Sequence, residues 1–273
     1  MSPAKTISRG AAIPFIDIRG QRIHYEDTGG AGPVLAFSHG LLMDASMWDA
    51  QVEALGGSYR CITWDERGHG QTGEASADFT YEDSADDLLG LLDSLGIARA
   101  TLVGMSQGGY VTQRAAVRQP GIAQALVFIS TQATEEEPAK VAVYDTLIDA
   151  WESGGLTDQL AETIAGLVIG SDCPEREEWI AKWKRMDPAS LRTIYRALVT
   201  RRDFTPRLPE LDVPALVIWG DQDPAISRDH ARALAEGLPQ GRLEVVGGAG
   251  HGVNFTHPDA VNPLLERFLA LAL

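Results

Sequence analysis

The chain has 273 residues, of which 44% are hydrophobic, and this length and composition allow one large buried core. Its 23 basic and 38 acidic residues give a net charge of −15, which argues against nucleic acid and anionic membranes as partners. No apolar run reaches the roughly 18 residues that a membrane span needs.

The amino-terminal segment and the cysteines indicate a cellular location. Residues 1–20 carry four charged side chains and lack a long apolar run, so a secretory signal is not expected. The two cysteines, Cys61 and Cys173, do not make a disulfide framework. The predicted location is therefore the cytoplasm.

Strand and helix patterns alternate along the chain. Residues 13–20 and 21–27 alternate in polarity around a turn and predict an antiparallel hairpin. Apolar runs predict buried strands at 33–38, 59–65, 100–104, 124–130, 213–220 and 241–248. Helical patterns lie at 46–55, 81–95, 107–118, 227–238 and 258–273. This order predicts an α/β fold, with a mostly parallel sheet flanked by helices.

Residues 135–208 interrupt this alternation. They contain few strand patterns and four helical ones, at 138–153, 157–169, 175–185 and 188–200. We expect a helical cap inserted between two core strands. Residues 1–134 and 209–273 would then form the core, and residues 135–208 the cap, or lid.

The segment 102–111, LVGMSQGGYV, places Ser106 between Gly104 and Gly108, after a predicted strand and before a predicted helix. A serine hydroxyl becomes a nucleophile when a base takes its proton and the backbone presents it to the substrate. A sharp strand-to-helix turn presents it, and small residues two positions away keep neighbouring chain clear. The pattern predicts Ser106 as a nucleophile; the alternative is an ordinary serine that caps the helix.

A serine nucleophile needs a histidine base, and in this type of site the chain order is Ser, Asp or Glu, then His. Three histidines follow Ser106. His230 falls inside a predicted helix, and His257 lies at the start of the last one. His251 lies in a glycine-rich loop after the last strand, at the sheet edge where sites form in open α/β sheets. His251 is therefore the predicted base.

Two aspartates at the same sheet edge are candidates for the acid that orients the histidine. Asp221 and Asp223 both follow the strand 213–220, and both are also residue types that form turns. We prefer Asp223 and keep Asp221 as the alternative. After strand 124–130 no carboxylate occurs before Glu135, so a competing acid is not expected there.

Two backbone N–H groups are needed to stabilise the oxyanion of an acyl-transfer reaction. One is expected from Gln107, the residue after the nucleophile. The other is expected from Leu41, because Gly40 lets the chain turn sharply in the loop after strand 33–38. His39 in that loop is an alternative base, but it precedes Ser106, and its expected role is a hydrogen bond that organises the loop.

Together the segments SHGLLMDASMW, WDERGHGQT, GMSQGG, VIWGDQDP and GAGHGVNF resemble the successive motifs of the α/β-hydrolase family. The resemblance implies a Ser106, Asp223 and His251 triad with an oxyanion hole at Leu41 and Gln107. It also implies that DERGHGQT is a structural turn. The chain looks most like the branch of carboxylesterases, 3-oxoadipate enol-lactonases and cofactor-free haloperoxidases.

A serine nucleophile suits acyl transfer, so the predicted activity is hydrolysis of a small-molecule ester or lactone through an acyl-enzyme. Carbon–carbon bond hydrolysis of a ring-cleavage product and non-catalytic ligand binding are the alternatives. No cofactor and no metal are expected. Trp151 and Trp183 are candidate substrate-binding residues of the cap. Arg201 and Arg202 would bind one substrate carboxylate or form a solvated helix end.

Overall fold

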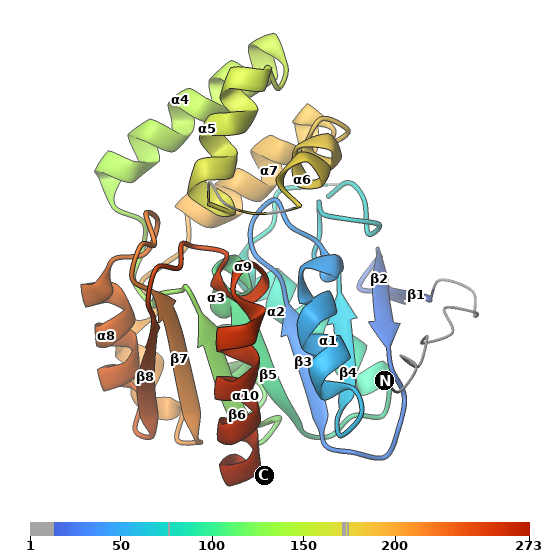
Figure 1. The fold of residues 1–273 in the computed structure, drawn as a ribbon. Coiled ribbons are helices and arrows are strands. Elements are labelled where there is room, and N and C mark those ends of the chain that lie inside the picture. The colour runs from blue at the N-terminus through green and yellow to red at the C-terminus, as the bar shows by residue number, and fades with distance from the viewer. Residues whose placement is uncertain (1–13, 76, 171–172, 174) are drawn as a thin grey trace, which may run out of the picture.

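The computed structural model describes residues 14–75, 77–170, 173 and 175–273 (Figure 1). The predictions for residues 1–13 therefore lie outside the described part. No helix of that part is long and apolar enough to cross a membrane.

Within the described residues, eight strands form one sheet in the order β1-β2-β4-β3-β5-β6-β7-β8. The pairs β1–β2 and β2–β4 are antiparallel and all the others are parallel, so the amino-terminal hairpin and the mostly parallel sheet are confirmed. The strands are β1 (Phe15–Ile18), β2 (Gln21–Asp27), β3 (Val34–Ser38), β4 (Arg60–Trp64), β5 (Ala100–Met105), β6 (Ala123–Ile129), β7 (Ala215–Gly220) and β8 (Gly241–Val246).

Helices cover both faces of this sheet. In Figure 1, α1 and α10 lie in front of the sheet, and α2 and α3 lie behind it. The described helices of the core are η1 (Ala45–Trp48), α1 (Asp49–Leu55), α2 (Tyr81–Ser94), α3 (Gln107–Arg118), η2 (Thr205–Glu210), α8 (Arg228–Gly237), α9 (Val253–Thr256) and α10 (Pro258–Ala272). The predicted helix 46–55 is thus split, because a 3-10 turn capped by the Asp44 side chain precedes α1.

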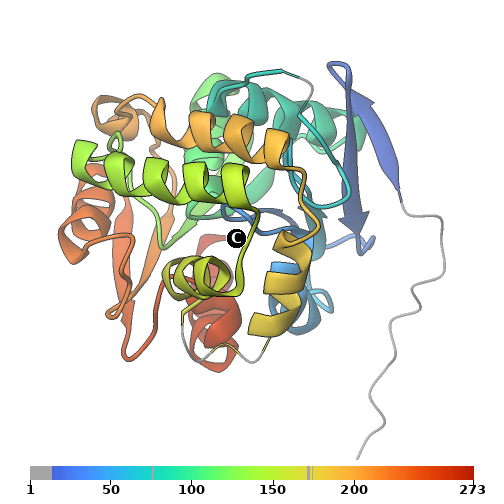
Figure 2. The same cartoon turned by 90° about the horizontal axis from the view of Figure 1, so that it is seen from above.

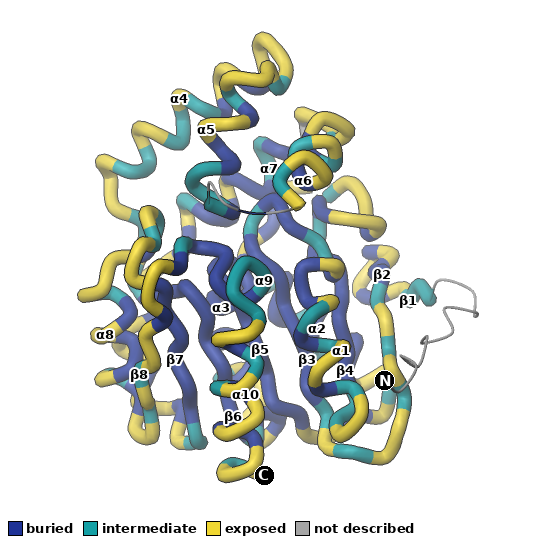
Figure 3. The backbone as a smooth tube through the Cα atoms, in the orientation of Figure 1, coloured by how far each residue is buried: buried dark blue, intermediate teal, exposed yellow. Residues whose placement is uncertain are grey.

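The core lies on both faces of the central strands. Every residue of β5 and β7 is buried, as expected for strands covered on two faces. Figure 3 shows this buried centre, with exposed positions on the outer sides of the helices. The helix α2 illustrates the sequence logic: Thr80 and Asp83 form a capping box, and Ala85, Leu88 and Leu92 are buried on one face.

Four helices between β6 and β7 lie over the carboxyl edge of the sheet (Figures 1 and 2). They are α4 (Pro138–Gly154), α5 (Asp158–Val168), α6 (Arg176–Trp183) and α7 (Pro188–Val199), called the cap helices below. The loops after β3, β5, β7 and β8 end beneath them. Side chains from distant parts of the sequence therefore meet between the sheet edge and the cap helices.

Candidate active site

Ser106 lies at the sharp turn between β5 and α3. Its backbone has φ 49° and ψ −113°, a region that residues other than glycine rarely adopt. The turn is held by hydrogen bonds from the Ser106 N–H to the Ile129 carbonyl, 2.9 Å, and from the Thr131 hydroxyl to the Ser106 carbonyl, 2.8 Å. A methyl group at Gly104 or Gly108 would overlap backbone atoms, so both flanking glycines are required for this geometry.

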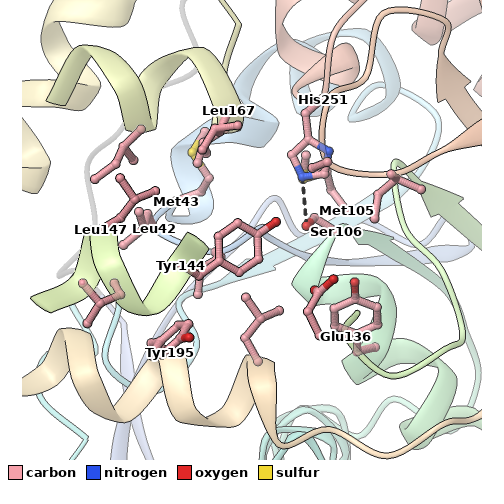
Figure 4. Close-up of a pocket in the computed structure, with 18 of the residues that line it drawn as sticks. Leu42, Met43, Met105, Ser106, Glu136, Tyr144, Leu147, Leu167, Tyr195 and His251 are labelled. Carbon is pink, nitrogen blue, oxygen red and sulfur yellow. Dashed lines mark hydrogen bonds between the residues drawn. The ribbon is translucent and has the colours of Figure 1, made fainter. Parts of the chain in front are cut away.

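His251 connects Ser106 to Asp223. Its Nε2 lies 3.0 Å from the Ser106 Oγ (Figure 4). Its Nδ1 lies 2.9 and 3.0 Å from the two carboxylate oxygens of Asp223. Each of the three residues follows a different parallel strand, β5, β7 or β8, at the carboxyl edge. The structure thus brings together the serine, acid and histidine that the sequence predicts. A donor–acceptor chain of this kind can move a proton off a hydroxyl.

The surroundings of Asp223 keep it ionised. Its Oδ1 accepts hydrogen bonds from the N–H groups of Ala225, 2.8 Å, and Ile226, 3.0 Å. Burial alone would raise the pKa of Asp223, but the charge and hydrogen bond of His251 and these two N–H groups outweigh it and lower the pKa. A charged Asp223 fixes the Nδ1 proton of His251 and leaves Nε2 free to face Ser106.

Asp221, the alternative acid, points elsewhere. Its Oδ1 accepts the N–H of Gly248 at 2.7 Å, a contact that joins the loop after β7 to the loop after β8. A second contact between these loops runs from the Gln222 N–H to the Ala249 carbonyl, 2.9 Å. Asp221 therefore helps to hold the loop that carries His251 without touching its ring.

The predicted oxyanion donors lie on two segments that meet at Ser106. Gln107 is the first residue of α3, and the first N–H groups of a helix have no acceptor within it. Leu41 borders the cavity beside Ser106. The next residue, Leu42, adopts φ 63°, and its carbonyl accepts a hydrogen bond from the Trp183 indole at 2.7 Å.

The side chain of Gln107 belongs to a buried chain of hydrogen bonds that the sequence did not predict. The Tyr81 hydroxyl donates to its Oε1 at 3.2 Å, and its Nε2 donates to Glu66 Oε2 at 3.1 Å. Burial raises the pKa of Glu66 well above its ordinary value, although the hydrogen bond from Gln107 opposes this shift. The buried carboxyl of Glu66 thus anchors the residue that follows the nucleophile.

A cavity opens over Ser106 and His251, between the sheet edge and the cap helices. Its walls are mostly apolar and aromatic, and include Leu42, Met105, Tyr144, Trp151 and Ile226. Such a pocket suits a small molecule with an apolar part. Among the described residues, no group of three or more histidine, cysteine, aspartate or glutamate side chains is placed to hold a metal ion.

Comparison with known proteins agrees with this architecture. Residues 34–264 match the family described as the alpha/beta hydrolase family. The chain belongs to the α/β-hydrolase family. That assignment confirms the resemblance seen in the sequence motifs.

Three solved structures similar to this α/β-hydrolase carry the names of the three expected groups. An enol-lactonase from Burkholderia xenovorans LB400 is 29% identical with a TM-score of 0.86, covering 94% of this chain and 100% of that one. A thermophilic esterase from Thermogutta terrifontis is 28% identical with a TM-score of 0.83, and the match covers 92% of this chain and 94% of the esterase. A bromoperoxidase from Bacillus anthracis is 26% identical with a TM-score of 0.81, and the match covers 91% of this chain and 95% of the bromoperoxidase.

The two candidate tryptophans of the cap helices differ in position. Trp151 borders the cavity over Ser106. Trp183 is fully buried and borders a different pocket, together with Trp179 and Lys182, and its Nε1 donates to the Leu42 carbonyl. This bond joins the cap helices to the loop after β3, and a role of Trp183 in substrate binding stays a prediction.

Other cavity residues were missed at the level of sequence. Figure 4 shows the hydroxyl of Tyr144 pointing toward Ser106. On α4, Ile148 and Trp151 lie four and seven residues after Tyr144, and all three residues border the cavity. That spacing is the signature of one helix face and was available in the sequence, but it did not indicate which face turns toward the site.

The remaining histidines of this α/β-hydrolase have structural contacts. His39 Nδ1 lies 2.8 Å from the Gly40 carbonyl, and its Nε2 accepts the Glu66 N–H at 3.0 Å. His39 thus bonds within its own loop through Nδ1 and to the segment after β4 through Nε2, in agreement with the expected hydrogen bond that organises the loop. His230 contacts Ser227 at the start of α8, far along the chain from the Ser106 turn.

Proposed function

We propose that this chain is a serine hydrolase that cleaves a carboxylic ester or lactone through an acyl-enzyme. The observation that carries the proposal is the continuous contact from Asp223 through His251 to the Ser106 Oγ, with 2.9 and 3.0 Å separations. The apolar cavity directly above Ser106 supports a small-molecule substrate.

In the first half of the reaction, Ser106 Oγ attacks the carbonyl carbon and its proton passes to His251 Nε2. The negative charge on the carbonyl oxygen is stabilised by the N–H groups of Leu41 and Gln107. Asp223 stabilises the positive charge that forms on the His251 ring. When the carbon–oxygen bond of the ester breaks, the leaving alcohol takes the proton from Nε2.

In the second half, water replaces the alcohol. His251 Nε2 accepts a proton from water, and the resulting hydroxide attacks the carbonyl carbon of the acyl-enzyme. The proton then returns to Ser106 Oγ as the acid leaves. One ester and one water molecule are consumed, and one acid and one alcohol are produced.

The test compares wild type, Ser106→Ala and Ser94→Ala with a short-chain p-nitrophenyl ester and a set of lactones. We expect Ser106→Ala to lower kcat by on the order of 10⁴–10⁶. Ser94→Ala is the matched control, because Ser94 is exposed at the end of α2 and its hydroxyl donates to the Gly90 carbonyl of the same helix. Full activity in Ser106→Ala would show that the proposal is wrong.

Two further measurements separate the alternatives. A fluorophosphonate should label wild type and not Ser106→Ala. Absence of both labelling and ester turnover in the folded wild type would favour a ligand-binding protein. Turnover of a vinylogous diketone in the absence of ester turnover would favour carbon–carbon bond hydrolysis.

A further inference from the structure

One carboxylate faces the otherwise apolar cavity. Glu136 follows β6 and borders the cavity together with Ser106 and His251, and its side chain is 6% exposed. Figure 4 shows it beside Ser106, on the far side of the nucleophile from His251, with its carboxylate directed into the same space as the Tyr144 hydroxyl. A substrate bound over Ser106 therefore lies next to Glu136.

Arg201 holds Glu136 in this position. Its Nη1 donates to Glu136 Oε2 at 3.1 Å, and its side chain is 1% exposed. Arg201 also donates to the carbonyls of Thr134 and Leu198, at 3.2 and 2.8 Å, and its guanidinium lies 4.3 Å from the centre of the Tyr110 ring. The guanidinium that the sequence offered as a ligand for a substrate carboxylate is thus committed to a carboxylate of the chain itself.

The positions of Glu136 and Arg201 relative to the cavity decide which of their two charges lies next to the substrate. Glu136 borders the cavity and Arg201 does not, so the negative end of the pair faces the substrate. No lysine or arginine is among the described residues that border the cavity. The net charge of −15 adds a field of the same sign over the whole molecule, which repels anions and attracts cations.

Resting on the serine hydrolase function proposed above, we infer that Glu136 makes this enzyme select esters whose apolar chain ends in a hydrogen-bond donor, either an ammonium or a hydroxyl group. A substrate carboxylate placed there would meet the like charge of a side chain that is only 6% exposed. A donor would instead form a charge-assisted hydrogen bond with Glu136.

The experiment uses two series of esters matched in length, one varied in the acyl chain and one in the alcohol. The acyl series is methyl hexanoate, methyl 6-aminohexanoate and the monomethyl ester of adipic acid. The alcohol series is the acetates of 1-hexanol, 6-amino-1-hexanol, 1,6-hexanediol and 6-hydroxyhexanoic acid. Hydrolysis is followed by proton release at constant pH, and kcat/KM is compared within each series.

We expect kcat/KM for the carboxylate ester to be about tenfold or more below that for the neutral ester in at least one series. In the same series the ammonium or hydroxyl ester should equal or exceed the neutral one. Equal kcat/KM across both series, or a preference for the carboxylate ester, would overturn the inference. Failure of every ester would instead count against the serine hydrolase function.

Variants assign the selectivity to Glu136. Glu136→Gln should raise kcat/KM for the carboxylate ester relative to the neutral ester by about tenfold. Glu135→Gln, the same change at the exposed neighbouring position, should leave the ratio unchanged. Because Glu136→Gln leaves Arg201 buried without its partner, the double variant Glu136→Gln/Arg201→Met removes both charges and should also abolish the discrimination. Unchanged discrimination in the folded double variant would contradict the assignment.

Discussion

Replacing Glu66 by glutamine should change how the stability of the protein depends on pH. Glu66 is fully buried, and its Oε2 accepts the Gln107 side-chain amide at 3.1 Å. A glutamine has nearly the same shape and keeps an oxygen for this hydrogen bond, but it cannot ionise. The substitution therefore isolates the proton of Glu66 while the packing around Gln107 is preserved.

The sign of the effect follows from the raised pKa of Glu66. In the folded chain this pKa lies well above the ordinary value of 4.5, because burial penalises the charged carboxylate. The stability that the bound proton contributes is complete below pH 4.5 and is lost as pH rises toward the folded pKa. In that interval, the free energy of unfolding of wild type should fall by ~1.4 kcal/mol per pH unit relative to Glu66→Gln.

Urea unfolding of wild type, Glu66→Gln and Glu74→Gln at pH 5, 6, 7 and 8 measures this difference. Glu74 is exposed, so Glu74→Gln makes the same change of net charge without a buried proton. We expect the free energy of unfolding of Glu74→Gln to change with pH in parallel with that of wild type. The free energy of unfolding of Glu66→Gln should rise relative to wild type as the pH increases. Parallel curves for all three proteins would refute the assignment of a buried neutral carboxyl at Glu66.

Three other substitutions test the site and its supports. Asp223→Asn should lower kcat by about 10⁴, whereas Asp221→Asn, which loses no contact to His251, should stay within a few-fold of wild type in the same ester assay. Gly108→Ala should lower the free energy of unfolding, measured by thermal unfolding, by ~2 kcal/mol or more, because the added methyl group overlaps the Ser38 carbonyl. Gly57→Ala is the control, because the space around Gly57 is open. Trp183→Phe should lower the free energy of unfolding by ~1–3 kcal/mol, because it leaves the buried Leu42 carbonyl without its hydrogen bond. In the ester assay this substitution should lower kcat more than it changes KM.

Much of the core could be predicted because its signals are local. Apolar runs gave β5, β6 and β7 to within a few residues, since a strand covered on both faces must be apolar throughout. The start of α2 at Tyr81 follows from Thr80 and the face of leucines behind it. The 3-10 turn before α1 was missed, because the cap at Asp44 has the same appearance in either helix type.

The placement of Ser106, His251 and Asp223 could be predicted for a topological reason. Each residue follows a parallel strand, and the carboxyl ends of parallel strands meet at one edge of the sheet. The residues need not be near each other in sequence for that to hold. By contrast, Trp183 was expected to border the cavity over Ser106, and it does not. The spacing of residues along α6 does not indicate how that helix is rotated on the core, so the position of Trp183 could not be predicted.

The same limit explains why Glu66 and Glu136 were missed. Each is a glutamate in a polar stretch of sequence, where charged side chains are ordinarily solvated. Their burial depends on partners that are distant along the chain: Gln107 for Glu66, and Arg201 for Glu136. The backbone motifs predicted here are those of the α/β-hydrolase family in general, and they are set by local geometry. The two buried carboxyls arise only when the tertiary structure brings these pairs together, so no local motif in this chain identifies them.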